Sequence, residues 1–130
     1  MECSLNNENY VNVYRIEKRG RGPFRYPTSF QKELDDALNI EHPTPHHDVG
    51  IDRKWFDRQN IKDYRFGSPC PSSLKGWIKK PEVLQQLGFK VALYKVKKDY
   101  AHSSEIQSMF IKRHAKKVRE WTVEEFCSIK

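Results

Sequence analysis

The chain has 130 residues, the size of one domain, and its 37% hydrophobic and 12% aromatic content is enough to bury a core and too high for a disordered chain. Its formal charge of +7, from 24 Lys and Arg against 17 Asp and Glu, favours an anionic partner such as a phosphate, a nucleotide or a nucleic acid. The sequence has no long apolar run for a membrane span and begins with polar residues unlike a signal peptide, so we expect one non-membrane domain over residues 1–130, flexible at 1–8.

The cysteines carry information about the compartment. Cys3, Cys70 and Cys127 are odd in number, scattered, and without C-x-x-C spacing. This pattern favours reduced thiols over a disulfide framework or a zinc cage. We therefore expect a cytoplasmic protein that holds no metal ion and no other cofactor.

The first predicted element is a strand over Asn9 to Lys18, where β-branched and aromatic residues nearly alternate with polar ones. The alternation divides its apolar side chains between two faces, with Tyr10, Tyr14 and Ile16 on one and Val11 and Val13 on the other. Two glycines and a proline follow the strand and end it.

A basic and aromatic loop follows the strand. Arginine grips phosphate bidentately and aromatic rings stack on bases, so this loop contains the residue types that a nucleotide site needs. The candidate ligand-binding residues in it are Arg19, Arg21, Phe24, Arg25 and Tyr26. Gly20 and Gly22 would let the backbone approach a ligand closely. The alternative is a solvated turn whose two aromatic rings are buried in the core.

A short amphipathic helix is predicted over Ser29 to Asn39. Thr28 and Gln31 have the spacing of a capping box, and apolar residues recur at helical intervals behind them. Pro43 and Pro45 end this helix and stiffen the segment that comes after it.

That segment, Ile40 to Trp55, contains His42, His46 and His47 followed by Asp48. A zinc site needs its ligands in a fixed geometry, and the intervening prolines prevent the helix that would place two of these histidines on one face. A loop metal site and a general base remain alternatives. The favoured interpretation is a rigid loop whose polar side chains cap neighbouring groups or line a pocket, without a metal.

A second helical region and the most regular strand follow. Ser72 is expected to cap the helix, Pro81 to restart it, and Gly88 to end it. Phe89 to Lys98 is then predicted as a strand that is apolar on both faces, and therefore central in a sheet.

Two more strands are predicted at Glu105 to Lys112 and Ala115 to Trp121, joined by a tight turn near Arg113 and His114. The complete order indicates an α+β domain with a mainly antiparallel sheet and two or three short helices. Gln107, Arg113 and Lys117 join the candidate ligand-binding residues. The sequence contains no phosphate-binding glycine motif and no familiar nucleic-acid-binding motif.

The order of the motifs resembles a known family. "VYRIE", "GRGPFR", "HPTPHHD", "FGSPCPSSLKGWI", "LGFKVALYKV" and "IQSMFIKRHAKKV" together resemble the first type of Thoeris anti-defence sponge, small phage proteins that counter a bacterial defence system. The resemblance covers roughly Val13 to Val118. It implies a protein that acts in the host cytoplasm, binds cyclic ADP-ribose isomers or cyclic oligonucleotides without cleaving them, and assembles as a homodimer or homohexamer.

The resemblance also implies roles for particular residues. The arginines of "RGRGPFR" and the cluster from Arg113 to Lys117 would grip the pyrophosphate, and adenine would meet Tyr26, Phe66 or Phe89. The histidine loop would be scaffold or pocket wall and not a metal centre. Two departures bear on ligand choice, namely the prolines of "FGSPCPSS" and the histidine pair of "HPTPHHD".

Two other classes of function remain open. A small enzyme could act on a nucleotide, either as a phosphodiesterase through the histidines or as an ADP-ribosyl transferase through the first strand. Alternatively, a basic phage protein could bind nucleic acid, with an affinity that falls steeply with salt.

Overall fold

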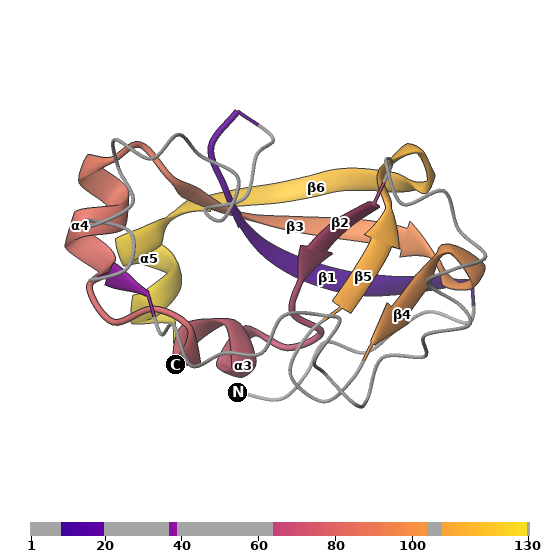
Figure 1. The fold of residues 1–130 in the computed structure, drawn as a ribbon, viewed down its shortest axis with the longest axis horizontal. Helices are drawn as coiled ribbons and strands as arrows, with labels where there is room; N and C mark the ends of the chain where they lie inside the picture. The colour runs from indigo at the N-terminus through magenta and orange to yellow at the C-terminus, as the bar shows by residue number, and fades with distance from the viewer. Residues whose placement is uncertain (1–8, 20–36, 39–63, 104–107, 130) are drawn as a thin grey trace.

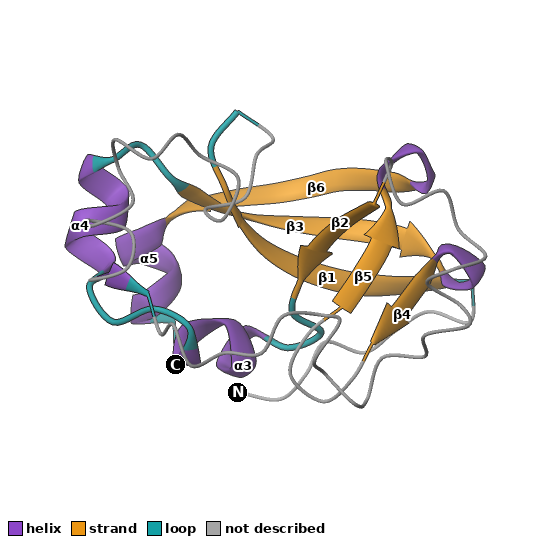
Figure 2. Ribbon diagram, viewed as in Figure 1, coloured by secondary structure: helices purple, strands orange, loops and turns teal. Residues whose placement is uncertain are grey.

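The computed structural model describes residues 9–19, 37–38, 64–103 and 108–129. It contains two three-stranded antiparallel sheets, ordered β1-β3-β6 and β2-β5-β4, together with short helices (Figures 1 and 2). The α+β prediction is confirmed. The predicted helix at Ser29 to Asn39, apart from Ala37 and Leu38, and the histidine loop at Ile40 to Trp55 lie outside the described residues, as do residues 1–8.

The first sheet is built from the predicted strands. Its members are β1 (Tyr10–Glu17), β3 (Lys90–Lys97) and β6 (Ala115–Thr122). β3 lies in the centre, as its apolar faces predicted, and pairs in register from Tyr10 opposite Lys97 to Glu17 opposite Lys90. Alternation along β1 then separates two faces of this sheet.

One side of the first sheet, here called the helix face, carries Tyr14 and Ile16. These side chains pack in a core with Leu74, Leu84 and Phe126, one from each of the described α-helices. The helices are α3 (Pro71–Gly76), α4 (Pro81–Gln86) and α5 (Val123–Ser128). Figure 1 shows them gathered at one end of the sheet, with the second sheet toward the other end.

The opposite side, here called the second face, carries Val13 and the other β1 side chains that alternate with those of the helix face. Val13 packs there with Tyr94 and Phe110, whose ring centroids are 5.4 Å apart. Phe110 comes from the second sheet, whose strands are β2 (Tyr64–Gly67), β4 (Ala101–Ser103) and β5 (Ser108–Ile111). The predicted division of β1 between two apolar faces is therefore confirmed.

The helix boundaries follow proline and glycine chemistry. Pro81 is the first residue of α4, as predicted, and Gly88 follows its end with φ of 91°, a conformation that glycine adopts without strain. The predicted cap at Ser72 is wrong: the N-cap of α3 is Cys70, two residues before Ser72, and the helix begins at Pro71, because a proline at the first helical position needs no amide partner.

The connection between β5 and β6 differs from the simple hairpin that a tight turn suggests. The 3-10 turn at Lys112–His114 joins them, but β5 pairs with β2 and β4 whereas β6 pairs with β3. The turn therefore carries the chain from one sheet to the other. Phe110, just before it, is 1% exposed between the sheets, and its burial favours this crossing over local pairing.

The cysteine prediction needs correction. Cys70 is disulfide-bonded and buried, so the expectation of reduced thiols is wrong for this residue, whereas Cys127 is free. Scattered spacing along the chain does not report the distance between two cysteines in the fold, and that distance decides whether a disulfide can form.

None of the described helices has the length and apolar character to cross a membrane.

We expect Gly67→Ala to destabilise the fold strongly. A Cβ at Gly67 would lie 2.5 Å from both the Tyr14 carbonyl oxygen and Val13 Cγ1. The adjacent residue Ser68 exchanges two backbone hydrogen bonds with Tyr14 at 2.7 and 2.8 Å, so the chains cannot separate freely. The unfolding free energy should fall by about 1–3 kcal/mol in urea denaturation.

Gly76→Ala is the matched control, since a Cβ there would meet no atom within 4 Å. Its unfolding free energy should be unchanged or raised by up to about 1 kcal/mol. Equal stability of the two variants would contradict the proposed close approach of β1 and β2.

Candidate functional site: a charged pocket on the second face

A charged pocket of about 410 Å³ lies on the second face of the first sheet, next to the apolar cluster that contains Phe110. Such a volume is in the range that holds small ligands. Its lining comes from the end of β1, the turn before β3, and the middle of β6: Glu17, Lys18, Arg19, Gly88, Lys90, Lys117 and Glu120.

Strand register brings the charged side chains to this face. Glu17 of β1 lies opposite Lys90 of β3. In β6, Lys117 is opposite Tyr94 and Arg119 is opposite Leu93, so the strand contains one extra residue, Val118, at a bulge. The bulge allows Lys117 and Glu120, three residues apart, to share one face, which strict alternation would forbid.

The carboxylate of Glu17 is the floor of the pocket and is 2% exposed. Arg15 Nε donates to it at 3.1 Å, the Tyr94 hydroxyl at 2.8 Å, and Lys117 Nζ lies 2.6 Å away. Arg15 is also buried, and its Nη1 donates to the Phe66 carbonyl oxygen at 2.8 Å. Burying a charge without such partners would lower the unfolding free energy by several kcal/mol, so the buried Arg15 and Glu17 both depend on these contacts.

The protonation states follow from this packing. Burial by itself would raise the pKa of Glu17, but hydrogen bonds from Lys117 and Tyr94 and the nearby positive charges outweigh it and lower that pKa. Burial and the Glu17 carboxylate raise the pKa of Tyr94 to about 12. Burial opposes the charge on Lys117, yet its contact with Glu17 raises the pKa of Lys117 overall. Lys117 and Glu17 are therefore both charged at neutral pH.

Above the floor, the rim is richer in positive charge. Glu120 lies between Lys117 at 3.3 Å and Lys90 at 3.5 Å. Lys18 Nζ donates to the Leu87 carbonyl oxygen at 2.7 Å, and Arg19 is exposed with φ of 53° as the chain turns away from β1. Four cations thus face two carboxylates, one of which already neutralises Arg15. The arrangement suits an anionic ligand.

The structure brings together two of the sequence-predicted ligand-binding residues. Arg19 and Lys117 both line the charged pocket, although 98 positions of sequence separate them. Arg113 lies in the turn before β6 and is outside the pocket lining. Phe66 is half-buried in the second sheet beside Met109 and Ile111. Five predicted residues lie outside the described ranges: Arg21, Phe24, Arg25, Tyr26 and Gln107.

The placement of Phe89 differs from that of a stacking platform. Its ring is 3% exposed and belongs to the core under the helices. A base could reach this ring only if the core opened.

Sequence reasoning missed the polar centre of the pocket. Arg15 and Glu17 occupy alternate positions of a strand that has apolar side chains on both faces. Since both faces of such a strand are expected to be buried, these two charged side chains are expected to be buried with one of them. That pattern was a usable signal. Lys90 and Glu120 had no such signal, because their meeting depends on strand pairing and on the bulge.

The described residues contain no group of three His, Cys, Asp or Glu side chains that could hold a metal ion. The histidine loop is not among those residues, so its interpretation as scaffold or pocket wall stays a prediction.

Comparison with known protein families gives a match over most of the chain. The family model described as "Bacteriophage T4 Y00F protein" matches residues 6–124. No curated protein and no solved structure gives a significant match to the chain.

The charge of Glu17 should make the fold acid-sensitive. Because its folded-state pKa lies below the ordinary value of 4.5, its contribution to stability is complete above that pH and is lost as the pH falls through the folded pKa. Glu17→Gln should lower the unfolding free energy at pH 7 by about 3 kcal/mol, since Arg15 stays buried without its counter-charge.

Urea denaturation between neutral and acid pH measures this difference. The stability gap between wild type and Glu17→Gln should narrow as the pH falls below 4.5. The depressed pKa of the helix-capping Glu125 affects both proteins alike and cancels in the comparison. A gap that is constant with pH would show that Glu17 is not held ionised.

Proposed function

We propose that this chain, which belongs to the bacteriophage T4 Y00F protein family, is a phage protein that binds a cyclic nucleotide immune signal and sequesters it without cleavage. The ligand class is cyclic ADP-ribose of the glycocyclic type, extending to cyclic oligonucleotides. The observation that carries the proposal is the charged pocket, in which Arg19 and Lys117 meet.

The pocket has the chemistry to hold a pyrophosphate. Arg19 offers a planar guanidinium suited to two phosphate oxygens, and Lys90 offers a point charge on the other side of the turn that ends at Gly88. Lys117 already contacts Glu17 and Glu120, so its position is set before a ligand arrives. A preset cation loses less conformational freedom on binding than a mobile one.

Charge by itself does not give the affinity that sequestration needs. Nanomolar binding corresponds to about 12 kcal/mol, whereas each charge-assisted hydrogen bond contributes roughly 1.5–3 kcal/mol. Stacking and burial of the adenine must provide much of the remainder. The described lining of the pocket contains no aromatic side chain, so the stacking ring would come from another part of the chain, such as Phe24 or Tyr26, or from a second copy.

The carboxylates favour holding over cleaving. A general base works best with a pKa near the working pH, and the contacts around Glu17 move its pKa in the opposite direction. Glu120 in turn lies between two lysines. We therefore propose a binding protein and not an enzyme, which distinguishes this function from the phosphodiesterase and transferase alternatives.

The host cytoplasm is the site of action in this proposal. Disulfides are rare in that compartment because its thiol pool keeps cysteines reduced. The disulfide at Cys70 can persist in the cytoplasm only if reducing thiols cannot reach it. Cys70 is 6% exposed, and this burial restricts their access.

Calorimetric titration with a glycocyclic ADP-ribose tests the ligand. Arg19→Ala and Lys90→Gln should each weaken binding about tenfold, the loss of one charge-assisted contact. Lys95→Gln is the control, because Lys95 is on the same strand as Lys90 but on the helix face. Unchanged affinity in both pocket variants would exclude this pocket as the site.

The fate of the ligand tests the absence of cleavage. After incubation, the complex is denatured by heat and the supernatant is chromatographed. We expect the cyclic ligand to be recovered intact. A linear product would instead establish an enzyme and return attention to the histidines of the loop at Ile40 to Trp55.

The assembly state is a separate prediction. The resemblance to Thoeris sponges and the need for a stacking ring both favour a homodimer or a homohexamer. Light scattering after size-exclusion chromatography should give two or six times the mass of one chain. A monomeric mass with tight ligand binding would place the stacking ring within the same chain.

A further inference from the structure

The helices cover only part of the helix face. Strand alternation places Tyr10, Asn12, Lys95, Lys97 and Lys116 on the same face as Tyr14 and Ile16, but farther from the helices along the sheet. Figure 2 shows the three strands continuing well past the helical end. We call these five residues the open sheet surface. Tyr10 is 39% exposed there.

Positive charge dominates this surface. Its three lysines are exposed, and none of them forms an ion pair with another of the described residues. Lys97 and Arg113 both contribute, after burial, to lowering the pKa of His114 at the adjoining turn, which is consistent with a positive potential at this end. A nearby carboxylate, Asp99, lies in the turn after β3.

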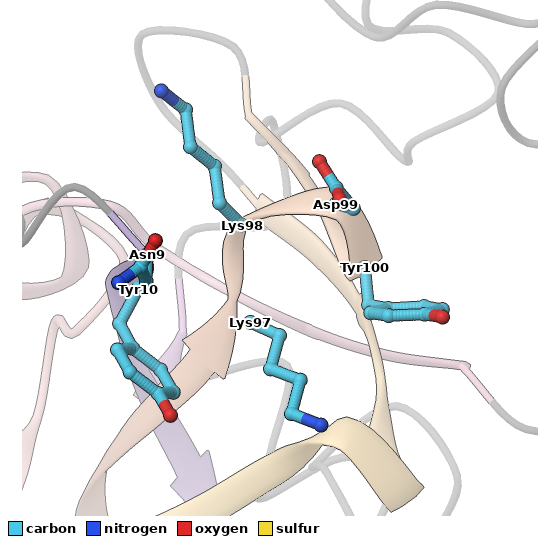
Figure 3. Close-up of a pocket in the computed structure, with 6 residues that line it drawn as sticks. All are labelled: Asn9, Tyr10, Lys97, Lys98, Asp99 and Tyr100. Atoms are coloured by element: carbon cyan, nitrogen blue, oxygen red, sulfur yellow. The ribbon is translucent and has the colours of Figure 1, made fainter.

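A shallow pocket of about 330 Å³ adjoins the surface at the end of β3. Figure 3 shows Tyr10 and Lys97 extending to the same side of the strands, whereas Lys98 extends away from them. Tyr100, which also lines the pocket, stacks on His114 with ring centroids 3.5 Å apart. The exposed ring of Tyr10 and the cation of Lys97 therefore lie on one side of the strands at the edge of the surface.

Lysines beside an exposed aromatic ring on a sheet form the arrangement that binds single-stranded nucleic acid, because cations follow the phosphates while bases stack on rings. A duplex fits less well. The major groove admits a helix or a two-stranded ribbon, whereas this surface spans three strands at roughly 4.8 Å spacing plus their side chains.

We propose that the open sheet surface binds single-stranded nucleic acid, with Lys95, Lys97 and Lys116 on the phosphates and Tyr10 stacked on a base. This surface is separate from the charged pocket. Lys90 and Lys95 belong to one strand but to opposite faces of it, so either site can be removed without the other.

Fluorescence anisotropy with a labelled oligothymidylate of about a dozen nucleotides, titrated at several KCl concentrations, tests the proposal. The triple variant Lys95→Gln, Lys97→Gln, Lys116→Gln should reduce the slope of log affinity against log salt by about 2, since each phosphate contact on a single strand contributes about 0.7. Tyr10→Leu should weaken binding about fivefold or more by removing a stacked base.

The double variant Lys79→Gln, Lys80→Gln is the control for net charge. Both lysines are exposed in the connection between α3 and α4, at the helical end of the molecule. This variant should retain the wild-type slope. Circular dichroism melting checks that all variants remain folded.

The proposal is overturned if wild-type protein does not bind the oligonucleotide at low salt, if the triple variant keeps the wild-type slope, or if the matched duplex binds more tightly than the single strand. Titration of the triple variant with glycocyclic ADP-ribose keeps the two proposals distinct. Retained affinity for that ligand shows that the charged pocket is intact whatever the oligonucleotide does.

Discussion

The buried ion pair between Arg15 and Glu17 is the interaction on which the rest of the structure depends. Both side chains are at most 5% exposed, and their atoms approach to 3.1 Å. Burying either charge without the other would cost several kcal/mol of unfolding free energy, so the position of each side chain depends on the other. Arg15 also bonds the Phe66 carbonyl oxygen, which links the two sheets, while Glu17 holds Tyr94 and Lys117. One pair thus joins the packing of the sheets to the position of Lys117 in the charged pocket.

The second constraint is the bulge in β6. It lets Lys117 and Glu120 share the second face, while Arg119 lies on the helix face over the Trp121 ring at 4.6 Å. Charge therefore gathers on both faces of the first sheet. The helices cover part of the helix face, and the second sheet covers part of the second face. The uncovered parts of the two faces lie at different ends of the first sheet. A small domain obtains two chemically similar but separate surfaces in this way.

Local patterns predicted the regular elements well. The alternation of β1, the apolar run of β3, the proline that opens α4 and the glycine that follows it are short-range features, and each was confirmed. Two elements were missed: β4, which has only three residues, and α5, whose capping box of Thr122 and Glu125 begins at the last residue of a strand. The division into two sheets was missed because a turn does not show which strands it pairs.

By itself, the sequence determined the α+β class, the central strand and the excess of positive charge. Those features depend on residue type and on spacing within a few positions. The tertiary structure alone decided that Arg15, Glu17, Tyr94 and Lys117 form one buried network, that Cys70 is disulfide-bonded, and that Phe89 belongs to the core. The reason is physical: contacts between distant segments depend on register, on a one-residue bulge and on which faces the helices cover.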